Sequence, residues 1–277
     1  MIVATDGREQ SDAAIRAGAL LAGRSDAWFV LTVVSPLPIT APELDLRIAA
    51  EAVAVHRETQ VQAVHDQVRR ILGEREVRVE ALDGNPADVI ARTAAKTNAS
   101  LIVAGLGRHK IIDRVLGDET VLRLIRSAET PVLAIDGAFA IPKTVVVGLD
   151  FSENSVNAAR FALRLVQHGA TVSLMNVAPR DDLLGMVTGG PAVYHERAMA
   201  TMNDLISKLE VPPGVHVQPV VRLGDPGTRI LEYAAETHAE LIALGTRGQG
   251  FVARMLAGSV ATKIIRASPI AVLTLPQ

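Results

Sequence analysis

Residues 224–275 read GDPGTRILEYAAETHAELIALGTRGQGFVARMLAGSVATKIIRASPIAVLTL, and residues 84–135 repeat this stretch at a constant offset of 140 positions. The two stretches align without a gap and share 16 of their 52 residues. Upstream, VATDGRE (3–9) resembles VGLDFSE (147–153), and VLTVVSP (30–36) resembles SLMNVAP (173–179). Because self-similarity across a whole chain indicates one structural unit used twice, the sequence predicts two domains, residues 1–138 and 139–277.

Within each copy, short apolar runs alternate with amphipathic segments. In the second copy the expected strands are 144–147, 171–177, 215–221, 240–244 and 270–275, and the expected helices are 153–168, 191–209, 226–238 and 258–266. Strands that alternate with helices of ten or more residues predict crossover units and a parallel sheet with helices on both faces. The first copy repeats this plan, with a longer second helix over 46–73. The fold class is therefore α/β, as two tandem Rossmann-like domains.

The composition excludes several classes of function. The 277 residues include 28 Lys and Arg against 30 Asp and Glu, a net charge of −2, so the chain lacks the basic excess that a nucleic-acid partner requires. Cysteine is absent, which excludes disulfides and thiolate nucleophiles and favours a cytoplasmic protein. Charges at Asp6, Arg8 and Glu9 interrupt any signal-peptide core, and no apolar run approaches the roughly 18 residues of a membrane span. No membrane partner is expected.

The loops after the strands of the second copy carry the pattern of an anion site. Glycine occupies positions 245, 248 and 258, and Ser259 opens the last helix. Helix-opening N–H groups lack internal partners and bear a partial positive charge, and glycine lets a phosphate approach the backbone. Arg247 could reach a phosphate, and Asp150, at the end of the first strand, could accept hydrogen bonds from ribose or a base. Alternatively, the glycines serve only tight turns and Ser259 only caps its helix.

At these residues the chain resembles the universal stress protein family in its tandem form. The pattern GxxG, nine residues, then G(S/T) marks the ATP-binding branch of that family, and the second copy matches every fixed position. The resemblance implies adenine nucleotide alpha hydrolase-like domains with sheet order 3-2-1-4-5. It also implies bound ATP, to which a magnesium ion could be attached. The implied contacts are Leu149, Asp150, Val177, Leu244, Gly245, Arg247, Gly248, Gly258, Ser259, Val260 and Ala261.

The first copy departs from this pattern. Arg108 stands where Gly248 stands in the second copy, and Asp118 and Glu119 replace Gly258 and Ser259. Two carboxylates suit the opening turn of a helix but repel phosphate. The sequence therefore predicts that the first copy keeps the fold without binding ATP, and that each chain binds one nucleotide.

No catalytic constellation is evident. The seven histidines include no pair at the i, i+4 spacing of a helical metal site, and neither GxxxxGK[ST] nor GxGxxG with its acidic partner occurs. The first hypothesis is thus an ATP-binding regulatory protein of the stress response that acts on an unknown protein partner. The alternatives are a slow ATPase or adenylyl-transfer enzyme and a nucleotide-independent dimerisation module. The resemblance further implies an intrachain pseudo-dimer through 132–135 and 272–275, and a homodimer is a further possibility.

Overall fold

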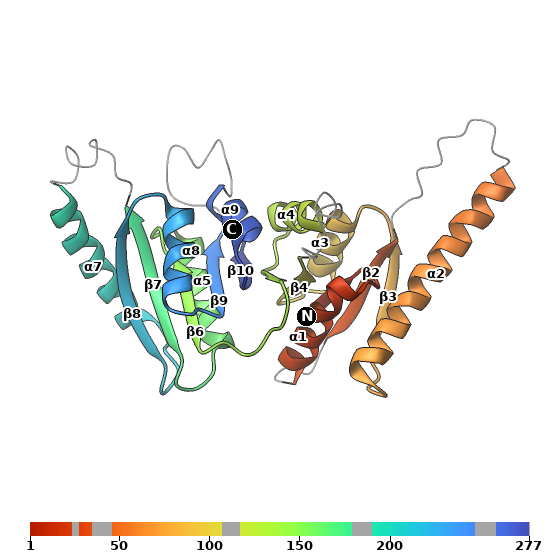
Figure 1. Ribbon diagram of the computed structural model, residues 1–277, viewed down its shortest axis with the longest axis horizontal. Coiled ribbons are helices and arrows are strands. Elements are labelled where there is room, and N and C mark those ends of the chain that lie inside the picture. The colour runs from red at the N-terminus through yellow and green to blue at the C-terminus, as the bar shows by residue number, and fades with distance from the viewer. Residues whose placement is uncertain (24–27, 35–45, 107–116, 179–189, 247–258, 277) are drawn as a thin grey trace. The chain divides into compact units, whose positions relative to one another are not determined.

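The computed structural model describes residues 1–23, 28–34, 46–106, 117–178, 190–246 and 259–276. The chain divides into two compact units, Met1–Phe139 (unit 1) and Ala140–Gln277 (unit 2) (Figure 1). The strands of unit 1 are ordered β3-β2-β1-β4-β5, and those of unit 2 are ordered β8-β7-β6-β9-β10. All described pairings within each unit are parallel. Both units therefore have the order 3-2-1-4-5, and the predicted fold class is confirmed.

The described elements follow the predicted alternation in both units. Unit 1 contains β1 (Ile2–Thr5), a short 3-10 helix (Glu9–Ser11), α1 (Asp12–Ala22), β2 (Phe29–Val34), α2 (Leu46–Leu72), β3 (Val79–Asp83), α3 (Pro86–Lys96), β4 (Ile102–Gly105), α4 (Gly117–Ser127) and β5 (Val132–Ile135). Unit 2 contains β6 (Thr144–Gly148), α5 (Glu153–Leu165), β7 (Thr171–Ala178), α7 (Pro191–Lys208), β8 (His216–Leu223), α8 (Pro226–Glu236), β9 (Leu241–Gly245), α9 (Ser259–Ala267) and β10 (Ala271–Leu275).

Burial explains why the inner strands are almost wholly apolar. The inner strands β1, β4, β6 and β9 are buried along most of their length, whereas β3 and β8 are partly exposed. In unit 1, α1 packs with α2 and α3 packs with α4, while in unit 2 α8 packs with α9 and α7 lies along β8 (Figure 1). Helices on both faces leave the inner strands no contact with water, so a continuous apolar run replaces alternation.

Two helices of unit 2 end at least two residues earlier than the sequence predicts. The helix expected to run to His238 ends at Glu236, because Thr237 is the C-cap and His238 takes a φ of 51°. A residue in the left-handed region just beyond a helix ends it, and Asn98 does the same after α3 with a φ of 50°. The helix expected to run to His168 ends at Leu165, since Val166 has an extended backbone.

The strand register corrects the sequence alignment of the second strands by one residue. Alignment of 30–36 with 173–179 places Val33 opposite Asn176. In the sheets, however, Ile2 pairs with Phe29 and its counterpart Val146 pairs with Ser173, so Thr32 is the counterpart of Asn176. A slip of one residue moves a side chain to the other face of a sheet, so this correction decides which residues face α2 and α7.

The start of α8 yields a first prediction. The Asp225 carboxylate accepts a hydrogen bond from Thr228 N (2.9 Å) and pairs with Lys263, whereas Asn85, at the same place in unit 1, makes no side-chain cap bond. We expect Asp225→Ala to lower the free energy of unfolding of unit 2 by about 1 kcal/mol, and Asn85→Ala to cost unit 1 less. Chemical denaturation of both variants measures the difference, and equal losses would contradict the capping role.

The same carboxylate makes this stabilisation depend on pH. The hydrogen bond from Lys263, with those from Thr228, lowers the pKa of Asp225 from its usual 3.8 to about 2. Because the folded-state pKa is depressed, the stabilisation is present above the usual value and is lost as the pH falls toward 2. We therefore expect the free energy of unfolding, measured by denaturation at several pH values between 5 and 2, to decrease less steeply with falling pH for Asp225→Asn than for the unaltered chain.

Candidate functional site

The winding of unit 2 reverses at β6. This strand pairs with β7 on one side, through Gly148 and Met175 at its carboxyl end, and with β9 on the other, through Gly148 and Leu244. The connection after β6 leads towards β8, whereas the later connections run in the opposite direction through β9 and β10. In open α/β sheets, ligands bind beyond the carboxyl ends of the strands at such a reversal. The candidate site is therefore the edge formed by the ends of β6, β7 and β9.

Asp150 occupies this edge in a tight turn. Its Oδ1 atom accepts hydrogen bonds from Ser152 N (3.0 Å) and Ser152 Oγ (2.5 Å), and its side chain is exposed. Phe151 between them has a φ of 63°, an uncommon conformation for a bulky residue. Ser152 in turn caps α5 by accepting from Ser155 N (3.2 Å). The turn thus presents a carboxylate to solvent beside a helix N-terminus.

Unit 1 builds the same turn. Asp6 Oδ1 accepts from Arg8 N (3.1 Å) and Ser11 Oγ (3.0 Å), and Gly7 has a φ of 80°. Because this aspartate orders a turn in both units, its first role is structural. An exposed carboxylate of this kind can in addition accept hydrogen bonds from ligand hydroxyl or amine groups.

Gly245 has a packing role that sequence reasoning missed. A Cβ atom there would lie 2.9 Å from Asn154 Cβ and 3.0 Å from Ser155 N, at the start of α5. Gly105 in unit 1 makes the matching approach, 3.0 Å from Gln10 O and 3.1 Å from the Cα of Ser11. The shared glycine therefore lets the end of the fourth strand touch the helix that follows the first strand.

The opening turn of α9 distinguishes the two units. α9 begins at Ser259, which is exposed and followed by half-buried Val260, and its first turn contains no acidic residue. The corresponding position in α4 is Glu119, which is exposed. The sequence expectation of a helix start at Gly258 lies outside the described residues, as do the expected contacts Arg247 and Gly248.

The remaining expected contacts differ in whether their side chains are exposed enough to contact a ligand. Leu149, Leu244 and Ala261 are each 3% exposed, so their side chains belong to the core and only their backbone atoms could contact a ligand. Val177, at the end of β7, is partly exposed. Its register partner is Arg222 on β8, whose guanidinium lies 5.4 Å from the Tyr233 ring centroid. The described residues therefore bring Asp150 and Val177 to one sheet edge, where side chains can contribute directly.

Sequence reasoning also missed two polar residues behind this edge. Asn176 is 4% exposed and donates from Nδ2 to the carbonyl of Leu149 (2.8 Å). Its Oδ1 atom accepts from the hydroxyl of Tyr194 on α7 (2.7 Å). Burial raises the pKa of the Tyr194 phenol, while its hydrogen bond to Asn176 has a smaller opposite effect. An asparagine within a largely buried strand is the signal that could have indicated this contact.

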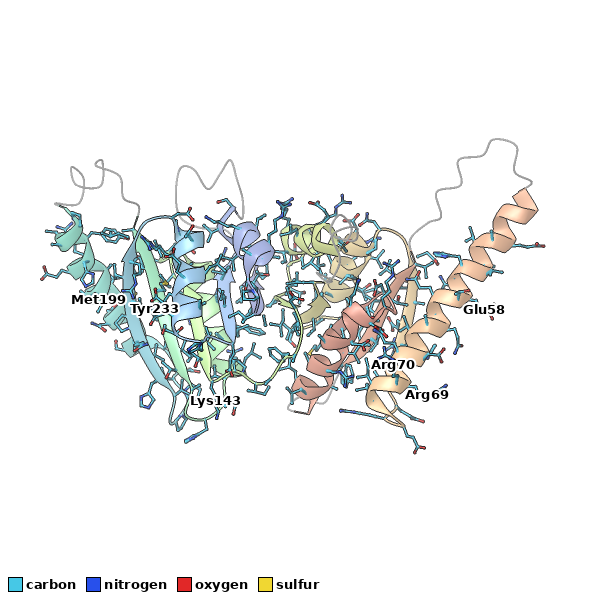
Figure 2. All side chains as sticks on the ribbon, in the orientation of Figure 1. Glu58, Arg69, Arg70, Lys143, Met199 and Tyr233 are labelled. Carbon is cyan, nitrogen blue, oxygen red and sulfur yellow. The ribbon has the colours of Figure 1, made fainter. Side chains whose placement is uncertain are left out.

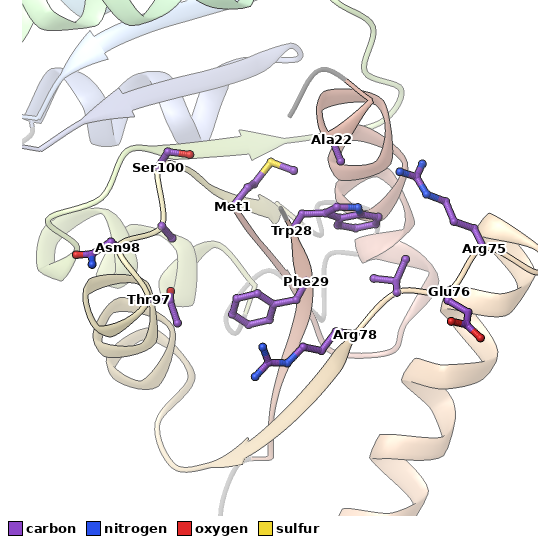
Figure 3. Close-up of a pocket in the computed structure, with 12 residues that line it drawn as sticks. Met1, Ala22, Trp28, Phe29, Arg75, Glu76, Arg78, Thr97, Asn98 and Ser100 are labelled. Atoms are coloured by element: carbon purple, nitrogen blue, oxygen red, sulfur yellow. The ribbon is translucent and has the colours of Figure 1, made fainter. Parts of the chain in front are cut away.

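Unit 1 contains a hollow of about 680 Å³ (Figure 3). It lies at the amino ends of the strands, where Trp28 and Phe29 meet two arginines. The guanidinium of Arg75 is 5.7 Å from the Trp28 ring centroid, and that of Arg78 is 5.5 Å from the Phe29 ring centroid. In open α/β sheets ligands bind at the opposite edge, so volume alone does not make this hollow the functional site.

The described residues contain no cluster of three or more His, Asp or Glu side chains that could hold a metal ion. In the same part of the chain, no helix is both long enough and apolar enough to cross a membrane.

Comparisons with known proteins agree with this architecture. The model of the universal stress protein family matches residues 1–136 and 142–276. A universal stress protein of Mycolicibacterium smegmatis is 27% identical over 290 residues, covering 97% of this chain and 94% of that protein. One from Thermus aquaticus is 30% identical over 135 residues, 47% of this chain and 96% of that protein. The crystal structure of a universal stress protein from Archaeoglobus fulgidus has a TM-score of 0.69 at 20% identity, with 99% and 97% coverage. With two matches to the family model in tandem, this chain belongs to the universal stress protein family.

Proposed function

We propose that unit 2 binds ATP at the carboxyl edge of its sheet and that unit 1 does not. The observation that carries the proposal is the acid-free opening turn of α9, the helix that follows β9 in the chain, and β9 pairs with β6 where the winding reverses. The matching turn in α4 carries Glu119. A partly positive helix N-terminus favours phosphate, and a carboxylate at the same place repels it.

The proposed contacts divide by chemistry. Backbone N–H groups at Gly245, Gly248 and Gly258, with the Ser259 hydroxyl and Arg247, would hold the phosphates, and a magnesium ion could accompany them. Asp150 and Val177 would contact ribose and adenine. Half-buried Val260 and the backbone atoms of Leu149, Leu244 and Ala261 would line the site.

We infer a regulatory role for the bound nucleotide, in which ATP changes a surface that a protein partner recognises and thereby takes part in stress adaptation. Such a signal requires different affinities for two conformations. The serine hydroxyls at this edge order the start of α5, because Ser152 donates to Asp150 and accepts from Ser155 N, and Ser155 donates to the Ser152 carbonyl. This is a helix-capping arrangement, which favours a structural role over nucleophilic catalysis. A slow ATPase remains the alternative, with the nucleotide-independent module as a second. The proposal places the protein in the cytoplasm, where ATP is abundant.

Stoichiometry tests the proposal. We expect calorimetry to give one ATP per chain, and mass spectrometry of ligand released from freshly purified, denatured protein to detect an adenine nucleotide. ATP at one hundred times its dissociation constant should stabilise unit 2 by about 2.7 kcal/mol against unfolding. Two equivalent sites, or a melting temperature unaffected by millimolar ATP, would refute it.

A further inference from the structure

Two hydrogen bonds connect the first turn of α7 with the end of β6. The hydroxyl of Tyr194 donates to Asn176 Oδ1 (2.7 Å), and Asn176 Nδ2 donates to the carbonyl of Leu149 (2.8 Å). Leu149 N remains bonded to the carbonyl of Met175 (2.8 Å), so its peptide group still belongs to the sheet. The next residue is Asp150. The connection therefore ends at the backbone that presents the exposed carboxylate of the candidate site.

Burial makes this connection costly to break. Asn176 is 4% exposed, and both ends of its amide have partners. A buried polar group that loses its partner pays the cost of desolvation without compensation. Tyr194 lies on the same face of α7 as Ala198 and Met202, which are buried against the sheet. Its ring can therefore keep its packing when the hydroxyl alone is removed.

A hollow beside the first turn of α7 indicates that the Tyr194 hydroxyl helps to hold this turn against the sheet. Beside the first turn lies a hollow of about 380 Å³, bordered by Pro191 and His195 on the helix and by 221–223 on β8. Close packing is thus incomplete at this end of α7. The hydrogen bond from Tyr194 therefore contributes a larger share of the interactions that hold the first turn of α7 to the sheet. The turn is held to the sheet on the Asn176 side.

Unit 1 holds its second helix differently. The counterpart of Asn176 is Thr32, whose hydroxyl accepts from Gln60 Nε2 (3.3 Å). Farther along α2, buried Gln67 donates to the Arg8 carbonyl (2.6 Å) and to Asp12 (2.8 Å). Arg70, which is labelled in Figure 2, donates to the same carboxylate twice. Several polar contacts fix α2 over the turn that follows β1. The tyrosine and asparagine are therefore particular to unit 2.

From this geometry we infer that Asn176 and Tyr194 are positioning residues of the proposed nucleotide site, which hold the Leu149–Asp150 backbone and couple the first turn of α7 to the bound nucleotide. The inference rests on the proposed function, because it concerns the same sheet edge. A nucleotide that contacts Asp150 would bind the anchored arrangement more tightly than one in which the Leu149 carbonyl has lost its partner. The first turn of α7 would then become more ordered when nucleotide binds.

Removal of one hydroxyl provides the test. Tyr194→Phe keeps the ring and deletes the donor, and we expect ATP to bind about 3- to 10-fold more weakly, as the loss of one hydrogen bond implies. The matched control is Tyr233→Phe (Figure 2), since the Tyr233 hydroxyl lies near Ser173 Oγ (3.3 Å) and Gln218 Nε2 (3.4 Å), away from the carboxyl edge. The control should bind ATP with unchanged affinity in calorimetry.

A double-mutant cycle separates a relay from two independent structural effects. Asn176→Thr installs the residue that unit 1 carries at this place and should weaken ATP binding to a similar extent. If Tyr194 acts through Asn176, then Tyr194→Phe in the Asn176→Thr chain should cause no further loss. Fully additive losses would overturn the inference.

Hydrogen exchange of the unaltered chain gives a readout that does not depend on how any variant folds. Saturating ATP should slow exchange in the first turn of α7, and the slowing should persist in Tyr233→Phe and disappear in Tyr194→Phe. If the unaltered chain binds ATP without this slowing, or if Tyr194→Phe binds as tightly as the control, the inference is wrong while the proposed function stands. If the unaltered chain does not bind ATP, the proposed function itself fails, and the inference fails with it.

Discussion

Ser259→Glu should abolish most ATP binding while leaving unit 2 at least as stable as before. The new carboxylate would stand at the opening of α9, where Ser259 is exposed and no acid is present in the first turn. Repulsion between like charges a few ångströms apart near a protein surface is worth several kcal/mol, and solvent screening reduces this. We expect at least about 2 kcal/mol, or a roughly 30-fold loss of affinity in calorimetry. An acid in the first turn of a helix, however, stabilises it by about 0.3–1 kcal/mol.

Ser259→Glu is expected to lower the affinity for ATP and to raise the stability of unit 2, so the two measurements together distinguish charge repulsion from unfolding. A variant that lost affinity because it unfolded would lose stability as well, and thermal denaturation distinguishes the two. The reciprocal control is Glu119→Ser in unit 1, which should lower the stability of α4 slightly and leave the affinity and stoichiometry of ATP unchanged. Undiminished binding by Ser259→Glu would show that the phosphates lie elsewhere.

Gly245→Ala should destabilise unit 2 by about 1–3 kcal/mol, because the added methyl group would lie within 3.0 Å of the backbone of α5. The backbone of Gly245 is not in the left-handed region, so the steric contact is the whole obstacle. Neither β9 nor the start of α5 can move without disturbing buried neighbours, Leu244 among them. Chemical denaturation followed by circular dichroism would measure the loss.

Gly105→Ala is the matched variant in unit 1, where the added methyl group would lie 3.0 Å from Gln10 O. It should cost a similar free energy and leave ATP binding unaffected. A neutral Gly245→Ala would refute the packing role, and a loss of affinity without a loss of stability would assign Gly245 to phosphate binding alone. The two variants thus distinguish a glycine required for close packing from a glycine required for phosphate binding, which the sequence pattern alone cannot separate.

The distinction matters because the glycine pattern mixes residues with different roles. Gly245 recurs as Gly105 in a unit that lacks the rest of the pattern, and close packing explains both. Ser259 has no such explanation, since its counterpart is Glu119. The difference between the two units therefore carries more information about ligand binding than the residues they share.

The fold was predictable because its signals are local. The offset of 140 residues, the short apolar runs and turn residues such as Gly224 and Pro226 are visible in the sequence, and together they specify a repeated parallel α/β unit. Helix ends were less predictable, because His238 takes a left-handed conformation that residues other than glycine adopt uncommonly. Part of the candidate site could be proposed in the same way, since Asp150 lies just beyond the end of the first strand of the second copy.

The amino-acid sequence by itself determined the repeat, the strand and helix alternation and the difference between Ser259 and Glu119, since each depends on residue type and spacing along the chain. Only the tertiary structure decided that Thr32 corresponds to Asn176, that Gly245 contacts the start of α5, and that Tyr194 reaches Asn176. These facts depend on which segments meet across strand register and helix packing. Such contacts form between groups that are distant in the chain, and no local pattern encodes their distances.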